Sequence, residues 1–261
     1  MVNEELINKR KIWYTYTPVL YALLEVCQKR EVVFGDTKNS HWIRGLSFKS
    51  IQGIKYIFEE MGFYEKNYNI YISCAKYVHI PNFTFNLSKR SEETLKWFHD
   101  IAIHHIISYD FLLDFDSEKK NYDIMINEVL GLLYLFKKYN IKCFIQNSGY
   151  KNIHIVIPKE NFNSTENILF VNSLINRFSI KTLCSTGIGV YNKIFKCPYS
   201  LVNDIVVLPQ SIDKILFEKE ICRMDTQEVL NNIMLKNRGF YFSNYSGVDE
   251  NYYKFIKDLL F

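Results

Sequence analysis

Paired cysteines and long apolar segments are both missing from this chain of 261 residues. Its six cysteines are scattered singly, and none belongs to a C-x-x-C pair or to a cysteine–histidine cluster with zinc spacing. The pattern argues against a disulfide framework or a zinc finger, and favours buried free thiols in a reducing compartment. Because no run of about twenty apolar residues occurs, we expect no membrane span.

Targeting signals and linkers are lacking as well. Residues 1–11 are mostly charged and polar, unlike a secretory signal peptide, so we expect an intracellular protein that is cytoplasmic or nucleoid-associated. No internal repeat, low-complexity tract or clear linker interrupts the chain. We therefore expect one domain over residues 1–261, with a helical C-terminal part over about 210–261. The formal charge of +4 is mild, and it permits a nucleic-acid partner without requiring one.

The spacing of the apolar residues predicts the order of helices and strands. Helices are expected at 13–29, 50–61, 92–99, 123–139, 164–177, 212–222, 225–236 and 249–260. Strands are expected at 30–34, 42–48, 68–75, 109–116, 141–147 and 152–157, with several short strands between 178 and 209. The strand–helix–strand–turn–strand order over 109–157 predicts an α/β layer with a mixed sheet.

Two aspartates one residue apart, Asp114 and Asp116, close an apolar run that begins at Tyr109. Alternate side chains of a strand share a face, so both carboxylates are expected on one side while Leu113 and Phe115 enter the core. Two close carboxylates repel each other unless a cation lies between them, which indicates a divalent-metal site suited to phosphoryl transfer. The alternative is a chance pair at the point where a strand runs into a loop.

Two further segments offer groups that can bind phosphate. Residues 148–154 (SGYKNIH) form a predicted turn between strands, in which a glycine opens backbone N–H groups and Ser148, Lys151 and His154 add donors. Residues 196–200 (KCPYS) offer a lysine that can contact phosphate as a point charge. Taken alone, the first segment could equally be a plain hairpin turn, and the second a strand end stopped by its proline.

Taken together and in this order, the three segments resemble the catalytic, small subunit of archaeo-eukaryotic primases. That family carries a D-x-D strand, an S-G-x-x-G-x-H turn and an R/K-x-P-x-S segment, which read here as 114–116, 148–154 and 196–200. Upstream segments are also similar to the family's R-E-F, R-H-x-x-F and Y-x-S-x-A-x-Y segments, and they read here as 30–31, 42–48 and 71–77. The six short matches occur in the family's order and cover about residues 30–209. Together they identify the family far more specifically than any single match does.

The resemblance implies an α+β fold with an RRM-like primase catalytic core, a mixed sheet and flanking helices. It implies that Asp114 and Asp116 are catalytic and hold one or two Mg²⁺ or Mn²⁺ ions. The nucleotide-binding residues that it implies are Ser148, His154, Lys196 and Arg44. The implied reaction is template-directed nucleotidyl transfer from nucleoside triphosphates on single-stranded DNA, making short primers. A large primase subunit is the usual partner of such proteins. The apolar residues Phe255, Leu259 and Leu260 of 249–261 could contact it, or could equally pack on the domain itself.

The family's third metal-binding aspartate is missing, since no Asp or Glu occurs at 167–203. The alignment places Cys184, or with a gap Lys181, near the expected position, and neither replaces a hard oxygen ligand well. A carboxylate from elsewhere, such as Asp110 or Asp204, could compensate. The alternative function is therefore a non-catalytic primase-like subunit that binds nucleotide, template or a partner. A third option is a general single-strand binder that stacks bases on its many aromatic residues.

Overall fold

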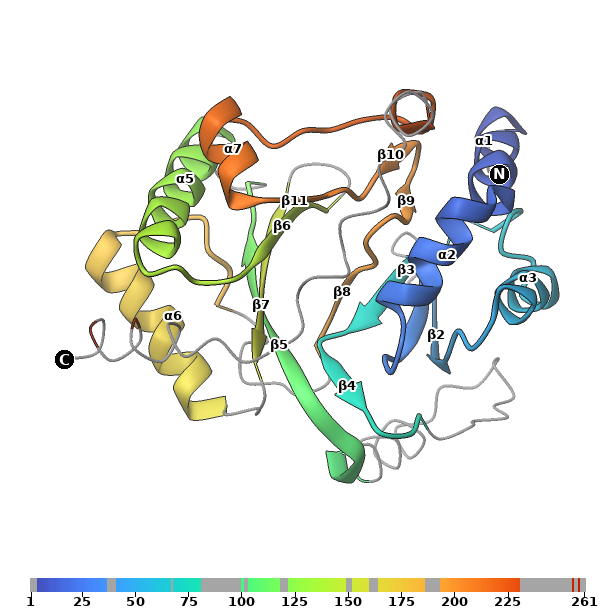
Figure 1. Cartoon of the computed structure of the whole chain (residues 1–261), viewed down its shortest axis with the longest axis horizontal. Coiled ribbons are helices and arrows are strands. Elements are labelled where there is room, and N and C mark those ends of the chain that lie inside the picture. Colours follow the sequence, from blue (N-terminus) through green and yellow to red (C-terminus); the bar gives the residue numbers. More distant parts are fainter. Residues whose placement is uncertain are drawn as a thin grey trace.

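The computed structural model describes residues 4–36, 41–66, 68–80, 100, 103–117, 122–148, 152–159, 164–185, 193–230, 255 and 258. Within these ranges the chain builds two larger sheets and a short two-stranded ribbon (Figure 1). The first sheet has the order β2 (His41–Leu46), β1 (Val32–Asp36), β3 (Asn69–Ser73) and β8 (Ile194–Lys196). The second has the order β11 (Pro209–Gln210), β6 (Phe144–Asn147), β7 (Ile153–Lys159), β5 (Ile106–Phe115) and β4 (Ala75–Tyr77). The ribbon pairs β9 (Leu201–Val202) with β10 (Ile205–Val206).

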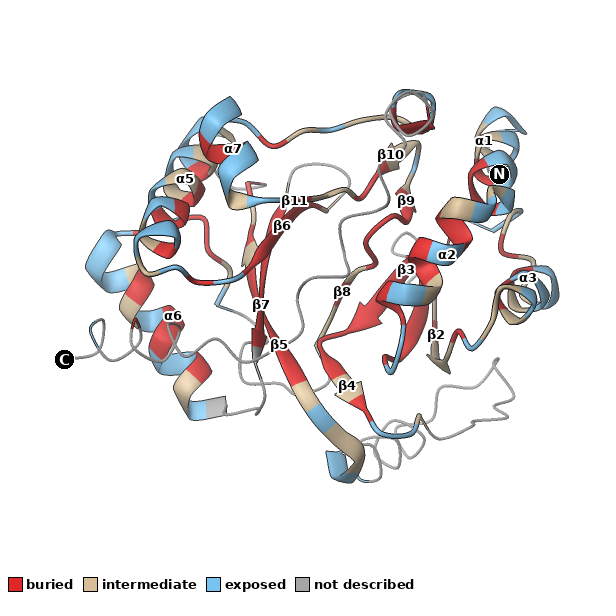
Figure 2. Ribbon diagram, in the orientation of Figure 1, coloured by how far each residue is buried: buried red, intermediate tan, exposed pale blue. Residues whose placement is uncertain are grey.

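Helices flank both sheets, and Figure 2 shows that the buried residues gather on the strands and on the helix faces turned toward them. Three helices pack with the first sheet: α1 (Glu4–Thr15), α2 (Thr17–Val26) and α3 (Ile51–Glu60). Three pack with the second: α5 (Tyr122–Lys138), α6 (Ser164–Phe178) and α7 (Ile212–Glu218). Each group of helices shares one buried cluster with the strands that it covers, so two cores meet where the sheets join.

The strand pairs of the described residues are antiparallel, where a mixed sheet was predicted. β5 and β6 run in the same direction, as a strand–helix–strand unit requires. However, β7 returns through the turn after β6 and inserts between them, pairing antiparallel with both. The α+β class with flanking helices is confirmed, and the position of β7 between β5 and β6 makes the sheet antiparallel.

The predicted helix at 13–29 is wrong, because the chain breaks it into α1 and α2. Tyr16 adopts an extended conformation, with φ −69° and ψ 117°, between the two helices. Pro18 then lies in the first turn of α2, where the missing N–H costs no helical hydrogen bond. The proline therefore starts a helix here, where the apolar spacing alone had predicted its interior.

Several predicted elements fall beyond what can be compared. The helix at 92–99 and most residues of the two helices at 225–236 and 249–260 lie outside the described residues. No helix among the described residues is both long enough and apolar enough to cross a membrane.

A buried ion pair joins the two sheets where the chain passes from β3 to β4. Arg30 pairs with Asp110 of β5, and the two side chains are 2% and 3% exposed. The Arg30 guanidinium also donates to the carbonyl oxygens of Ser73 and Cys74, at 2.9 and 3.3 Å. Lys76 Nζ lies 3.9 Å from Asp110 Oδ1. The arginine that the family resemblance singled out thus holds the junction between the sheets.

Candidate functional site

The two acidic residues of the D-x-D segment lie where β5 ends. Leu113 and Phe115 are buried in the core beneath α5 and α6. Asp114 and Asp116 occupy the alternating positions and are partly exposed. The strand therefore presents Asp114 on the side opposite that core, because successive side chains of a strand alternate between its faces, and Asp116 directly follows the last residue of the strand.

Asp114 faces His154 directly across the β5–β7 pair. The Asp114 Oδ1 atom lies 3.5 Å from His154 Nε2. The start of β7 is tied back to the end of β6 by the Ser148 N–H, which donates to the Asn152 carbonyl oxygen at 2.9 Å. Residues 149–151 of this turn lie outside the described residues. The register thus brings one residue of the D-x-D segment against one residue of the turn segment.

His154 is buried, and burial lowers its pKa below the ordinary value of 6.5. The Asp114 carboxylate opposes this shift, whereas the positive charges of Lys193 and Lys196 add to it. The imidazole is therefore neutral at neutral pH, and only one of its two nitrogens carries a proton.

Gln146 of β6 decides which nitrogen that is. Its side-chain amide donates to the Lys196 carbonyl oxygen at 2.8 Å, and the same nitrogen lies 3.4 Å from His154 Nδ1. An NH₂ group can only donate, so Nδ1 accepts and the proton lies on Nε2, on the side of Asp114. Sequence reasoning missed Gln146. Its signal was a polar residue in a short strand, which becomes informative only once β6 is known to pair with β7 opposite His154.

Lys196 lies at the end of β8, opposite Tyr71 of β3. Its ammonium donates to the Tyr71 hydroxyl at 2.5 Å and lies 4.1 Å from the centre of the Tyr71 ring. Burial lowers the pKa of Lys196 to about 7, because a charged ammonium is poorly solvated there. A lysine in this state can take up a proton when a phosphate arrives beside it.

The rest of the KCPYS segment is held by α1. Trp13 Nε1 donates to the Tyr199 carbonyl oxygen at 2.9 Å, and the Leu201 N–H donates to the Tyr14 hydroxyl at 2.8 Å. The buried Ser200 hydroxyl donates to the Cys197 carbonyl oxygen at 2.6 Å and closes the turn. These bonds set the position of β8, and therefore of Lys196.

Arg44, the fourth predicted nucleotide-binding residue, makes a bidentate ion pair with Glu31. Its Nε and Nη2 atoms donate to the two Glu31 carboxylate oxygens at 2.9 and 2.7 Å. Glu31 is fully buried, whereas the Arg44 side chain is 18% exposed. Because Glu31 also accepts from the Gly45 N–H at 3.0 Å, the pair fixes the course of β2.

The structure also shows where the two residues aligned with the family's third acid, Cys184 and Lys181, lie. Leu183 forms a β-bridge with Phe115 on the side of β5 away from β7. The Cys184 N–H donates to the Asp114 carbonyl oxygen at 2.8 Å, so Cys184 lies opposite Asp114. The Lys181 N–H instead donates to Glu128 of α5 at 2.8 Å. Of the two residues that the alignment suggested, Cys184 is the one placed beside the acids.

The other two carboxylates considered as substitutes are engaged elsewhere. Asp110 pairs with Arg30. Asp204 lies in the turn between β9 and β10, and its Oδ2 atom is 3.8 Å from Nζ of Lys9 in α1. Across the part of the chain that the structure describes, no three His, Cys, Asp or Glu side chains gather so that they could hold a metal ion. A cation at this site would therefore rest on two protein carboxylates.

The two carboxylates fit such a cation. The Asp114 Oδ1 atom is buried and has no hydrogen-bond partner among the described residues. A buried carboxylate oxygen without a partner is costly, and a cation would satisfy it. Mg²⁺ commonly binds through one or two carboxylates, with water and substrate phosphate oxygens as the other ligands. Asp114 and Asp116 therefore meet the minimal requirement for Mg²⁺ or Mn²⁺.

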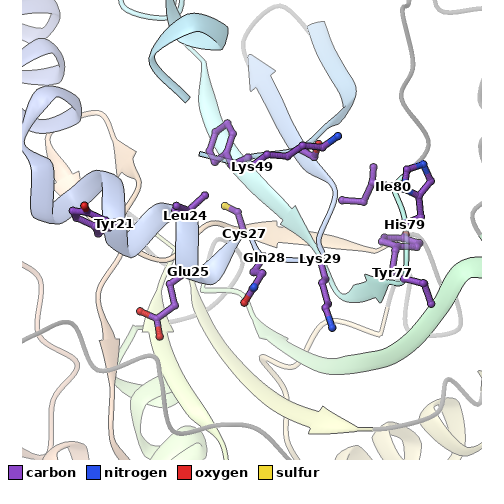
Figure 3. Close-up of a pocket in the computed structure, with 13 residues that line it drawn as sticks. Tyr21, Leu24, Glu25, Cys27, Gln28, Lys29, Lys49, Tyr77, His79 and Ile80 are labelled. Carbon is purple, nitrogen blue, oxygen red and sulfur yellow. The ribbon is translucent and has the colours of Figure 1, made fainter. Parts of the chain in front are cut away.

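A separate cavity of about 600 Å³ lies between the end of α2, the β2–α3 connection and the end of β4 (Figure 3). Tyr21, Lys29, Lys49 and His79 are among the residues that line it. None of the predicted site residues lines this cavity. The polar groups between β5, β7 and β8 are thus a different feature of the molecule.

Comparison with known proteins gives a likeness among solved structures. No family model matches the sequence, and no curated protein sequence matches it. Among solved structures, the chain is similar to the polymerase domain of ligase D from Mycobacterium tuberculosis, determined in complex with DNA. The TM-score is 0.60 at 14% identity, and the alignment covers 87% of this chain and 89% of that chain. At this identity the likeness shows the fold alone, which is that of a primase–polymerase core.

Proposed function

We propose that this chain catalyses template-directed nucleotidyl transfer on DNA, as a diverged member of the archaeo-eukaryotic primase superfamily. One observation carries the proposal: Asp114 and His154, from two segments that the sequence placed in different motifs, are direct neighbours across one strand pair. Lys196, from the third motif, is linked to the same histidine through Gln146. The shared primase–polymerase fold also supports the proposal.

Each residue has a distinct task in the proposed reaction. Asp114 and Asp116 would hold Mg²⁺ or Mn²⁺, which supplies charge stabilisation at the α-phosphate and lowers the pKa of the primer 3′-hydroxyl. The neutral imidazole of His154 would donate its Nε2 proton to a phosphate oxygen, held in that tautomer by Gln146. Lys196 would neutralise triphosphate charge. Ser148, at the end of β6, would add a donor from the turn.

Arg44 is assigned an assisting role in the proposal. Its guanidinium is already paired with the Glu31 carboxylate, so a contact with nucleotide would require Arg44 to share or leave this partner. The substrates proposed are nucleoside triphosphates and a single-stranded DNA template. A large primase subunit is retained as a proposed partner, and residues 249–261, suggested as its contact, are almost entirely outside the described residues.

The test is an extension assay with the full chain. Primed and unprimed single-stranded templates are incubated with labelled nucleoside triphosphates or deoxynucleoside triphosphates, in Mg²⁺ and separately in Mn²⁺. We expect template-dependent products in at least one metal. Extension of primed templates alone would indicate a polymerase without initiation, and no product under any condition would refute the catalytic proposal.

A second candidate function is a non-catalytic, primase-like subunit that binds nucleotide or template. The observation that favours it is the two-carboxylate site, which lacks the third acid among the described residues. It predicts nucleotide binding that is lost on His154→Ala, together with no synthesis in either metal. Extension that depends on metal and on Asp114 would exclude this candidate.

Nucleotide affinity should depend on pH through Lys196. Its pKa is about 7 in the free protein, so above pH 7 it must take up a proton to meet a triphosphate as a cation. We expect affinity to fall by up to about tenfold per pH unit between pH 7 and 9. His154, whose pKa is lowered below 6.5, stays neutral throughout this range.

Isothermal titration calorimetry of nucleoside triphosphate binding from pH 7 to 9 measures this slope. Lys196→Arg is the matched control, because arginine stays charged over the whole range and should give a flat profile. Equal slopes for wild type and Lys196→Arg would contradict the assignment of Lys196 as the phosphate-binding cation.

A further inference from the structure

One face of the first sheet carries a row of residues that includes Trp42 and Tyr71, two aromatic residues that the proposed reaction does not use; Trp42 is partly exposed and Tyr71 is buried. Trp42 of β2 lies opposite Gly35 of β1, and Tyr71 of β3 lies opposite Lys196 of β8. Phe34, Ile72 and Phe195, which alternate with these residues along the strands, enter the core shared with α1, α2 and α3. The row therefore lies on the face of the sheet turned away from those helices.

Gly35 makes this arrangement of aromatic rings possible. A Cβ atom at Gly35 would lie 2.4 and 2.5 Å from two carbons of the Trp42 ring, and 2.9 Å from a carbon of the Tyr71 ring. Only a residue without a side chain leaves room for the indole to lie directly on the strand. The Trp42 and Tyr71 ring centres are then 5.0 Å apart, with their planes at 53°. The indole remains partly exposed, although one side of it covers the glycine.

A continuous series of contacts links these rings to the candidate site. Tyr71 receives the hydrogen bond of the Lys196 ammonium at 2.5 Å. The Lys196 carbonyl oxygen receives the Gln146 amide at 2.8 Å, and Gln146 contacts His154, which faces Asp114. An aromatic surface, a cation and a carboxylate thus follow one another across the two sheets. A nucleotide presents the matching groups in the same order: a base, phosphates and a phosphate-bound cation.

We propose that Trp42, with the buried Tyr71 packed against it, forms a stacking surface for a nucleobase whose phosphate contacts Lys196. The inference rests on the proposed function, which puts the nucleotide phosphates beside Asp114. It adds a separate binding site for the base. Stacking suits the chemistry, because every base has a π-face and an indole offers the largest aromatic partner. The base belongs either to a free nucleoside triphosphate or to a strand of single-stranded DNA, and both share this chemistry.

Binding without turnover tests the inference, with a fluorescently labelled single-stranded oligonucleotide and with unlabelled nucleoside triphosphate, each in the absence of divalent metal. We expect Trp42→Ala to weaken binding of at least one ligand by about 5- to 100-fold, the range for loss of one base stack. Trp42→Phe should recover most of this loss, since it restores an aromatic face. Tyr134→Ala removes an aromatic residue of α5 that is 57% exposed, and it should leave both affinities unchanged.

The two ligands distinguish the two sources of the base. Loss confined to the oligonucleotide assigns the surface to the DNA strand, and loss that includes the free nucleotide assigns it to the incoming substrate. Quenching of tryptophan emission on binding, present in wild type and reduced in Trp42→Phe, is the second readout. Affinities of Trp42→Ala equal to wild type for both ligands, with a thermal transition showing a folded protein, would overturn the inference.

Failure of the inference differs from failure of the proposed function. Asp114-dependent extension together with unchanged binding by Trp42→Ala rejects the stacking surface alone. Trp42-dependent binding without extension by wild type in any metal keeps the stacking surface and rejects the catalytic proposal.

Discussion

Asp114→Asn should abolish metal-dependent extension, with a loss on the order of a thousandfold or more. The change is almost isosteric but removes the negative charge that would hold the divalent ion, and metal stabilisation of the transition state contributes several kcal/mol. The two-carboxylate site makes the effect severe, because no third acid stands beside the pair within the described residues to retain the ion. Primer extension in Mg²⁺ and Mn²⁺, followed over time on a denaturing gel, measures the loss.

The folded state should tolerate this substitution. The Asp114 Oδ1 atom is buried without a hydrogen-bond partner among the described residues, so removing its charge relieves an unfavourable burial. We therefore expect a thermal midpoint equal to or above that of the wild type. Asp213→Asn is the matched control, because Asp213 lies on α7 with its side chain 79% exposed and should affect neither quantity. Equal extension by wild type and Asp114→Asn would refute the assigned site.

Arg30→Met should give the largest loss of stability. It removes the Arg30 guanidinium from the buried Asp110 carboxylate and leaves Lys76 Nζ 3.9 Å away, and breaking a buried ion pair from one side typically costs about 3–5 kcal/mol. It also removes the donors to the carbonyl oxygens of Ser73 and Cys74. For a protein of this size the thermal midpoint should fall by on the order of 10 °C.

Two comparisons make the result specific. Lys137→Met breaks an exposed pair, in which Lys137 and Asp213 have side chains 58% and 79% exposed, and it should cost under about 1 kcal/mol. The double variant Arg30→Met with Asp110→Leu should recover much of the loss, because no unpaired charge remains buried. A midpoint for Arg30→Met as high as that for Lys137→Met would contradict the structural role of this pair.

Local periodicity was sufficient to predict the elements that pack through one face. The expected helices at 123–139 and 164–177 appear as Tyr122–Lys138 and Ser164–Phe178, because their apolar spacing directly encodes the face that they bury. The helix expected at 50–61 appears as Ile51–Glu60, and the Ser50 hydroxyl accepts the Gly53 N–H at 3.0 Å as its N-cap. The helix at 13–29 failed because the spacing continued through Tyr16 while the backbone did not.

For the candidate site, too, local sequence patterns predicted some features and only the tertiary structure decided the others. The amino-acid sequence alone determined that Asp114 lies opposite the face that Leu113 and Phe115 bury, since alternation is a property of a single strand. Only the tertiary structure decided that His154 faces Asp114, that Cys184 lies on the other side, and that Arg44 is held by Glu31. Register between strands depends on contacts between residues far apart in the chain, and no local pattern contains that information.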